Sequence, residues 1–215
     1  MIAETTLKTG PESARTKLLR VAIDVIRTKG YSATSVDELC VAAGVTKGAF
    51  FHHFESKESL AVAAAGFWSE TTGVLFAGAP YHDHADPLDR VLGYIDFRAG
   101  LLNGPIAGFT CLVGTMVQES YGTSAAIRDA CGASIFGHAE TLEADLAAAL
   151  AQRGVRGISA RSLARHTQAV LQGGFILAKA GGGEDAAAES VGHLKRYLEL
   201  LFRSGDPKPQ QGGRT

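Results

Sequence analysis

Apolar residues recur every three to four positions along almost the whole chain, and few segments alternate apolar and polar residues as a half-buried strand would. A repeat of this period places one apolar stripe on each helix, and other helices must cover it. The sequence therefore predicts an all-α fold of about nine helices. Their expected ranges are 11–29, 36–43, 47–53, 57–76, 88–102, 111–121, 125–152, 160–180 and 186–203.

Capping residues and glycines mark where the first helices begin and end. Gly30 is placed to end the first helix, and Ser35 followed three residues later by Glu38 is the pattern of a capping box. Gly44 supplies a turn, after which Thr46 can cap the next short helix. Two short helices joined by so tight a turn predict a helix-turn-helix unit.

Behind this unit the pattern predicts a larger helical body. Its longest helix, 125–152, carries one apolar stripe, and residues 78–87 are expected to form a polar loop. The expected organisation is a disordered arm over 1–10, a helix-turn-helix domain over 11–57, an effector-binding and dimerisation domain over 58–204, and a disordered tail over 205–215.

Composition narrows the class of protein. Hydrophobic residues make up 46% of the 215, enough for a sizeable core. We expect a cytoplasmic protein without membrane contact, because no run of roughly 18 uncharged apolar residues stands out and the first ten residues do not resemble a signal peptide. Three widely spaced cysteines, Cys40, Cys111 and Cys131, are expected to be reduced thiols.

Net charge does not decide whether the chain binds nucleic acid. The formal charge is −1, with eight Lys/Arg against six Asp/Glu in residues 1–57 and thirteen against sixteen in the rest. A helix-turn-helix needs only a local basic face. The prediction of DNA binding therefore rests on sequence motifs.

Residues 31–60 read YSATSVDELCVAAGVTKGAFFHHFESKESL. They resemble the DNA-binding head of the TetR/AcrR family: an aromatic-x-x-Thr lead after glycine, Ala-x-x-Gly-Val before the turn, Lys-Gly, aromatic-x-His-Phe, and Ser-Lys-Glu. The resemblance implies an all-helical homodimer that binds double-stranded DNA and is controlled by an effector. Beyond this segment the chain matches the family in length and helix count only.

The predicted recognition helix, 47–53, would enter the major groove end-on, so that its first side chains meet bases and its flanks meet phosphates. Lys47 can donate to a guanine or a phosphate, and Gly48 leaves room for an approaching backbone. Where the family usually has a phosphate-binding tyrosine, this chain has Phe51. The expected DNA-binding residues are Thr46, Lys47, Gly48, Phe51, His52, His53 and Lys57, the last resembling a phosphate anchor of the family. The alternative is that both lysines are solvated surface charges and the phenylalanines are core.

The resemblance implies that the last two predicted helices pair with a second copy in a four-helix bundle. The expected interface residues are Leu171, Gly174, Ala178, Leu194, Leu198 and Leu201. The alternative is that these faces close the core of a single chain.

Aromatic and apolar residues of the body are candidates for an effector pocket, although most aromatic stripes are core. The candidates are Phe67, Trp68, Phe97, Leu101, Phe109, Met116, Phe136, His138 and Phe175. His138 can also be a hydrogen-bonded core histidine. No cofactor or metal site is expected, because the His-containing loop at 81–86 has no second cluster of ligands.

The segment Phe109–Leu112 resembles the Gly-Cys-Leu stretch of the electrophile-sensing N-ethylmaleimide-reductase repressor branch of the family, with Thr110 in place of the glycine. In that branch a lysine matching Lys179 lies near the cysteine, and an ammonium group beside a thiol at a helix N-terminus favours the thiolate. Cys111 and Lys179 are therefore candidate sensor residues. The alternative is that Cys111 is a small core residue.

The predicted function is a transcriptional repressor released from an inverted-repeat operator by a small molecule or a thiol-reactive electrophile. The alternatives are an activator on the same head, a ligand carrier without DNA binding, or a helical enzyme. No nucleophile elbow, zinc-protease motif, phosphate loop or dinucleotide fingerprint supports an enzyme.

Overall fold

A computed structural model describes residues 12–203, and within them the chain is entirely helical, as predicted. The predicted arms at 1–10 and 205–215 lie outside the described residues. The helices are α1 (Ala14–Lys29), α2 (Val36–Ala43), α3 (Lys47–His53), α4 (Lys57–Ala77), the 3₁₀ helix η1 (Pro80–Asp83), α5 (Pro87–Gly100), α6 (Ile106–Phe109), α7 (Leu112–Ser120), α8 (Ala125–Glu140), α9 (Glu143–Gln152), α10 (Ala160–Gly181) and α11 (Asp185–Arg203).

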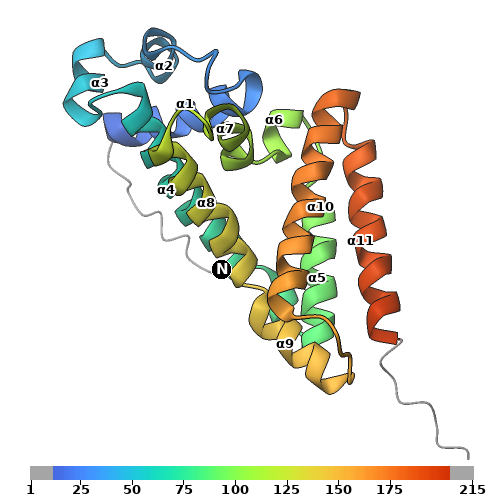
Figure 1. Ribbon diagram of the computed structural model, residues 1–215. Helices are drawn as coiled ribbons and strands as arrows, with labels where there is room; N and C mark the ends of the chain where they lie inside the picture. The colour runs from blue at the N-terminus through green and yellow to red at the C-terminus, as the bar shows by residue number, and fades with distance from the viewer. Residues whose placement is uncertain (1–11, 204–215) are drawn as a thin grey trace, which may run out of the picture.

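Helices α1, α2 and α3 form a small head at one end of the molecule (Figure 1). The predicted turn between α2 and α3 is present, because Gly44 ends α2 in the left-handed conformation with φ of 63°. Only half of the predicted capping box forms. Ser35 accepts the Glu38 N–H at 3.2 Å, but the Glu38 carboxylate pairs with Lys29 of α1 and so ties α2 to α1.

The core of the head extends into the rest of the chain. Leu18 and Phe50 of the head are fully buried in one cluster with Leu60 of α4, Met116 of α7 and Ile127 of α8. We call this cluster the head-side core. The head therefore depends for its packing on helices that follow it by more than fifty residues.

Helix α4 runs from the head into the body. Its N-terminal turns, including Leu60 and Ala64, are buried in the head-side core. By length and composition α4 could cross a membrane, and no other helix of residues 12–203 could. Part of this apolarity has a role within the fold, because Trp68 and Phe76 line a cavity.

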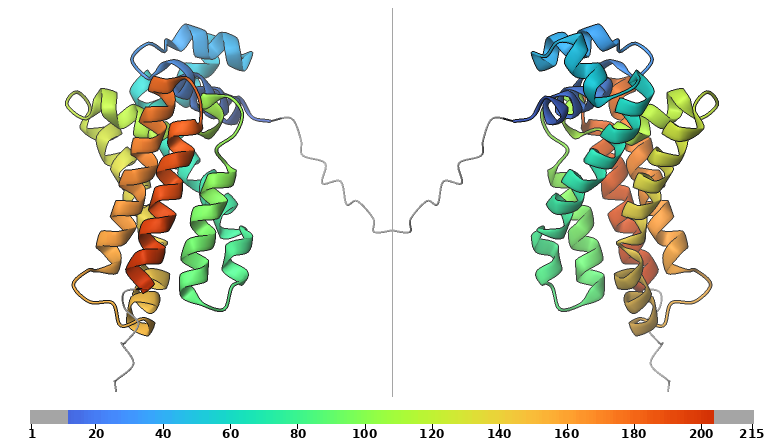
Figure 2. Two further views of the ribbon diagram at one scale, coloured as in Figure 1. Left: turned by 90° about the vertical axis from the view of Figure 1, so that its right-hand side faces the viewer. Right: turned by 90° about the vertical axis from the view of Figure 1, so that its left-hand side faces the viewer.

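The body contains α5 and α8–α11, with α10 and α11 packed along each other (Figures 1 and 2). A second core of leucines and aromatics fills the space between these helices. Arg90 of α5 pairs with Asp145 of α9 at 2.7 Å, and Lys195 of α11 pairs with Asp96 of α5 at 2.6 Å.

Three connections differ from the sequence prediction. The expected helix over 125–152 is interrupted by a turn at Thr141 and Leu142, which divides it into α8 and α9 (Figure 1). The expected polar loop over 78–87 contains η1, in which Tyr81 is buried and its hydroxyl donates to the Phe76 carbonyl oxygen. The four-residue helix α6 lies in the segment before α7.

The residues predicted for a dimer interface lie in the interior of the single chain. Leu171, Leu194 and Leu198 are almost completely buried, and a Cβ on Gly174 would meet the Ala187 Cα at 3.4 Å. Ala178 is also buried, and Leu201 packs partly buried against the same core. In the single chain the apolar stripes of α10 and α11 cover each other and α5, as in the alternative interpretation, so the buried members of this set are core residues.

Candidate functional site

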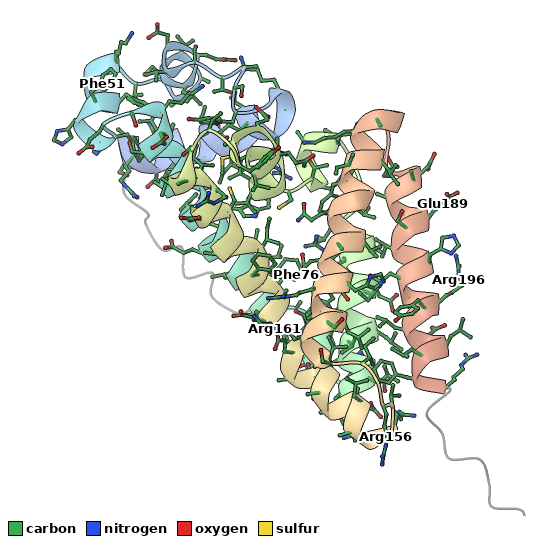
Figure 3. The ribbon with its side chains drawn as sticks, in the orientation of Figure 1. Phe51, Phe76, Arg156, Arg161, Glu189 and Arg196 are labelled. Atoms are coloured by element: carbon green, nitrogen blue, oxygen red, sulfur yellow. The ribbon has the colours of Figure 1, made fainter. Side chains whose placement is uncertain are left out.

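Helix α3 stands at the outer tip of the head with one face buried and the other in solvent. Phe50 is fully buried, whereas Phe51 is 51% exposed and points away from the body (Figure 3). The predicted N-cap is present, because Thr46 Oγ1 accepts the Ala49 N–H at 3.1 Å. Lys47, Gly48 and His52 are exposed and His53 is half-buried, so the solvent face of α3 carries the predicted DNA-binding residues.

Lys47 forms an exposed ion pair with Asp37 of α2, with Nζ 2.8 Å from Oδ1. The hydrogen bond to Asp37 raises the pKa of Lys47, so the side chain stays cationic. An exposed pair of this kind adds little to stability. The ammonium group can therefore move to a phosphate or a base at little cost.

Lys57 has a different environment. Its Nζ donates to the carbonyl oxygens of Tyr31 at 3.1 Å and Thr34 at 2.9 Å, and it lies 4.4 Å from the centre of the Tyr31 ring. An ammonium group has three N–H donors, so one is left for a phosphate. Lys57 thus ties the start of α4 to the loop before α2, a structural role that the sequence did not indicate.

Gly48 is not required by the packing of the head. A Cβ at this position would meet only Thr46 Oγ1, at 3.8 Å. The prediction that Gly48 allows close approach therefore concerns a bound partner and not the chain itself.

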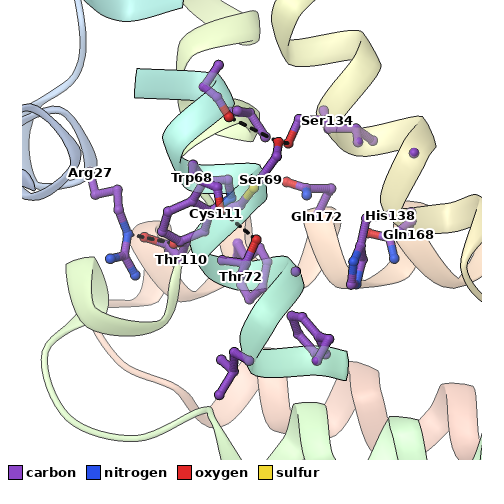
Figure 4. Close-up of a pocket in the computed structure, with 18 of the residues that line it drawn as sticks. Arg27, Trp68, Ser69, Thr72, Thr110, Cys111, Ser134, His138, Gln168 and Gln172 are labelled. Atoms are coloured by element: carbon purple, nitrogen blue, oxygen red, sulfur yellow. Dashed lines mark hydrogen bonds between the residues drawn. The ribbon is translucent and has the colours of Figure 1, made fainter. Parts of the chain in front are cut away.

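A cavity of about 610 Å³ lies in the body, a volume typical of small-molecule sites. Its walls come from α4, α5, α8 and α10 and from the connection between α6 and α7 (Figure 4). Of the residues predicted for an effector pocket, the structure brings together here Trp68, Leu101, Phe109, Cys111, His138 and Phe175.

Other predicted pocket residues do not line this cavity. Met116 is fully buried in the head-side core and Phe67 packs against that core. Phe97 packs against Phe76, with ring centres 5.6 Å apart, and Phe136 is exposed beneath the Arg165 guanidinium. Helical periodicity indicates which apolar residues share a face of a helix, but it does not distinguish a packed core from a cavity wall.

Sequence reasoning missed the polar lining of the cavity. Gln168 and Gln172 come from one face of α10, Arg98 from α5 and Arg27 from α1 of the head. The spacing of the two glutamines on an otherwise apolar stripe was an available signal, since polar groups facing a core need partners. Nothing in the local pattern of α1 indicated that Arg27 reaches the body.

His138 is both hydrogen-bonded and a wall residue. Its Nε2 lies 2.9 Å from the Tyr94 hydroxyl, which also accepts from Gln168 Nε2 at 3.2 Å. Because Tyr94 accepts from Gln168, its own proton is available to His138. Burial, followed by the nearby Arg98 charge, lowers the pKa of His138 to about 4, so the ring is neutral near pH 7.

Cys111 is the N-cap of α7, where its sulfur accepts the Gly114 N–H at 3.5 Å. It is partly exposed and lines both the main cavity and a neighbouring one of about 210 Å³, which also contains Lys179. Lys179 Nζ donates to Thr115 Oγ1 at 2.7 Å. Burial lowers the pKa of Lys179, and the Cys111 thiol opposes that shift, so the two predicted sensor residues interact electrostatically.

The other cysteines have structural environments. Cys131 is fully buried, and burial raises its pKa to about 12. Burial also raises the pKa of Cys40. Both thiols are therefore poor nucleophiles at neutral pH.

Arg27 joins the head to the cavity wall, and Glu119 joins it to α7. Arg27 Nε donates to the Thr110 carbonyl oxygen at 2.7 Å, and the guanidinium carbon lies 4.9 Å from the centre of the Trp68 ring (Figure 4). The carboxylate of Glu119, near the end of α7, accepts the backbone N–H groups of Tyr31 at 3.1 Å and Ser32 at 2.7 Å.

Two family models match the chain. Residues 18–64 match the model of bacterial regulatory proteins of the tetR family, and residues 87–186 match that of the LmrA/YxaF-like transcriptional regulator C-terminal domain. The first match covers the helix-turn-helix, and the second begins at α5 and ends at the start of α11.

Curated relatives are also transcriptional regulators. The HTH-type transcriptional repressor KstR2 of Rhodococcus jostii is 41% identical over 51 residues, which is 24% of this chain and 25% of KstR2. The transcriptional regulator AcuR of Cereibacter sphaeroides is 30% identical over 134 residues, which is 60% of this chain and 57% of AcuR. These alignments therefore span a quarter to about half of the relatives they match.

Solved structures show the same fold along nearly the whole chain. A TetR transcriptional regulator from Chloroflexus aurantiacus has a TM-score of 0.76 and 25% identity, covering 87% of this chain and 95% of that one. The reduced form of Escherichia coli NemR has a TM-score of 0.74 and 20% identity, covering 86% of this chain and 96% of that one.

Proposed function

We propose, since the chain belongs to the TetR family of bacterial transcriptional regulators, that it is a homodimeric cytoplasmic repressor released from an inverted-repeat operator by an effector. The observation that carries this proposal is the solvent face of α3, which presents Lys47, Phe51 and His52 on a capped helix at the tip of the head. A short helix exposed in this way suits end-on entry into a major groove.

Dimerisation follows from the limited reach of one head. A single short helix makes few base contacts, and a two-fold axis doubles them on a symmetric site. The exposed sides of α10 and α11 support a dimer better than the buried residues first predicted. On them lie His166 and Tyr197, with ring centres 5.3 Å apart, near the exposed Ala169, the half-buried Gly173 and the 49% exposed Leu177.

Release by an effector is supported by the cavity between α4 and α10. Its lining combines an apolar wall with convergent polar groups, as small-molecule sites do. A second mode of release is favoured by Cys111, a partly exposed thiol at the first turn of α7 with a lysine nearby. In that mode an electrophile would modify the sulfur beside α10.

The experiment is a titration of fluorescent operator fragments, taken from the DNA flanking the gene, with the purified protein. We expect binding as a dimer to an inverted repeat, with affinity falling steeply as salt rises. Transcription assays with RNA polymerase distinguish a repressor from an activator. Absence of binding to any fragment of the flanking DNA at low salt would favour the ligand-carrier alternative.

A further inference from the structure

We propose that the cavity takes a ligand with a flat apolar body and an acidic group, and that Arg27, a residue of the DNA-binding head, binds the acid. The proposal rests on the proposed function and names the chemical class of the effector and the residue that couples it to DNA.

The charges around the cavity favour an anion. Its lining includes two arginines, Arg27 and Arg98, and no aspartate or glutamate. His138 is neutral near pH 7, so the charge of the cavity lining comes from the two arginines. A cavity whose charged groups are all cationic binds an anion more tightly than a neutral molecule of the same shape.

Arg27 has unused hydrogen-bonding capacity. Its Nε donates to Thr110, but within residues 12–203 no acceptor reaches its two terminal amino groups and no carboxylate forms an ion pair with it. Burial lowers the pKa of Arg27, and the smaller effects of Asp24 and Cys111 act in the opposite direction. A carboxylate can take both remaining N–H directions of a guanidinium group at once.

A second unsatisfied group lies beside Arg27. The hydroxyl of Thr110 is buried and has no hydrogen-bond partner among the described residues. A buried hydroxyl without a partner costs ~1–3 kcal/mol unless a ligand or water satisfies it. Thr110 lines the cavity, so its hydroxyl is available to donate to an acid bound by Arg27.

Aromatic side chains in the cavity wall suit an aromatic body. The Arg98 guanidinium lies over the rings of Phe76 at 5.2 Å and Phe175 at 5.6 Å, and in residues 12–203 it has no ion pair. Together with the Trp68 ring beneath Arg27, these aromatic residues provide flat apolar surfaces along the cavity. A benzene or naphthalene ring matches such surfaces.

Arg27 also connects occupancy to the head. It belongs to α1, whereas its partner Thr110 immediately precedes the α7 N-cap, and Glu119 of the same helix holds Tyr31 and Ser32 of the head. An acid bound by the two terminal amino groups, with Nε still on the Thr110 carbonyl, would draw the guanidinium toward the cavity and bias the position of α1. Ligand binding and head position are then linked through a single side chain.

The test uses pairs of aromatic acids and their neutral amides: benzoate, cinnamate, 2-naphthoate and biphenyl-4-carboxylate, each against the matching carboxamide. Binding is measured by calorimetry and by quenching of Trp68, the only tryptophan in the sequence. We expect at least one acid to bind about tenfold or more tightly than its amide. If no acid is preferred in any pair, including the case in which nothing binds, the proposal is wrong.

Substitutions assign the role of Arg27. Arg27→Gln should lower the affinity for that acid by about tenfold without changing the affinity for the amide, and the acid at saturation should no longer release operator DNA. Arg20→Gln is the matched control, because Arg20 lies on the same helix and pairs with Glu12 in solvent. Unchanged acid binding by folded Arg27→Gln and Arg27→Met, checked by circular dichroism, would overturn the assignment.

Failure of this proposal can be told apart from failure of the proposed function. Operator binding by the ligand-free protein tests the second alone, and the difference between acid and amide tests the first without DNA. A protein that binds the operator but shows no preference for acids is a regulator with a different effector.

Discussion

Lys47 of the head and Lys57 at the start of α4 carry the same charge in different settings. Lys47 is exposed and paired with one carboxylate, whereas Lys57 is half-buried and holds two backbone carbonyl oxygens. An exposed ion pair adds little to stability, but a hydrogen bond from a charged group to partly buried carbonyls adds ~1.5–3 kcal/mol. Substituting each lysine therefore separates DNA contact from folding.

Lys47→Ala should leave the free energy of unfolding nearly unchanged and weaken operator binding by about tenfold or more per half-site. Lys57→Ala should lower the free energy of unfolding by about 1–3 kcal/mol and weaken binding to all DNA sequences. Urea unfolding and fluorescence anisotropy measure the two effects. Equal operator binding by Lys47→Ala and wild type across salt would refute the role of Lys47.

His138 makes stability depend on pH in a defined window. Burial lowers its folded-state pKa to about 4 from the model-peptide value of 6.5. As pH falls below 6.5 the unfolded chain takes up the proton first, so stability decreases until the folded state is also protonated near pH 4. The loss contributed by this residue is about 3 kcal/mol at most. In urea titrations, the free energy of unfolding of His138→Gln should decrease less between pH 6.5 and 4 than that of wild type. An equal decrease in the two proteins would show that other groups cause it.

At the scale of the helices, the start of α7 brings the candidate sensor chemistry to the cavity. Serine is a better N-cap than cysteine, so Cys111→Ser should preserve α7 and its contacts. If Cys111 is a sensor, a quinone or hypochlorite should release operator DNA from wild type and not from Cys111→Ser. Mass spectrometry should find the adduct on Cys111 and not on the buried Cys131. Release of the Cys111→Ser protein to the same extent would exclude the sensor role.

Helix types and many ends could be predicted because caps and periodicity are local. The ranges of α2 and α3 agree with the prediction, and Ser35, Thr46 and Ser159 cap the expected helices. The break between α8 and α9 could not be predicted, because the apolar spacing continues across it. Periodicity indicates which positions are buried but not which helices cover them. Leu146 and Ile127 lie on one predicted stripe, yet Leu146 is buried in the core of the body and Ile127 in the head-side core.

The same limit explains the site. The exposed face of α3, which we predict to contact DNA, could be located because a short segment contains all of it. The cavity could be predicted only in part, because its polar groups come from α1, α5 and α10, which only the tertiary fold brings together. The residues predicted for the dimer interface are mostly buried within one chain. An apolar stripe on α10 that packs against α11 has the same period as one that packs against a second copy, so the sequence could not distinguish them.

At the scale of the whole molecule, the exposed sides of α10 and α11 are the proposed dimer surface. A Cβ at Gly173 would meet open space in the single chain, so Gly173→Glu should leave the monomer folded while placing a carboxylate in a close helix contact. Sedimentation should show monomers, and operator affinity should fall with them. Gly192→Glu is the control, because Gly192 lies on the face of α11 that carries Glu189 and Arg196 and not on the face that carries Tyr197 (Figure 3). A stable Gly173→Glu dimer would place the interface elsewhere.

The head-side core has a consequence for engineering. A chimera could join the head of this protein to the body of another regulator at residue 64, where the match to the family model of the head ends. Here Leu18 and Phe50 share one buried cluster with Leu112, Met116 and Ile127, so a graft at that boundary would replace one half of a packed interface. The two halves should melt in a single calorimetric transition. A functional chimera must therefore exchange the inward faces of α7 and α8 together with the head.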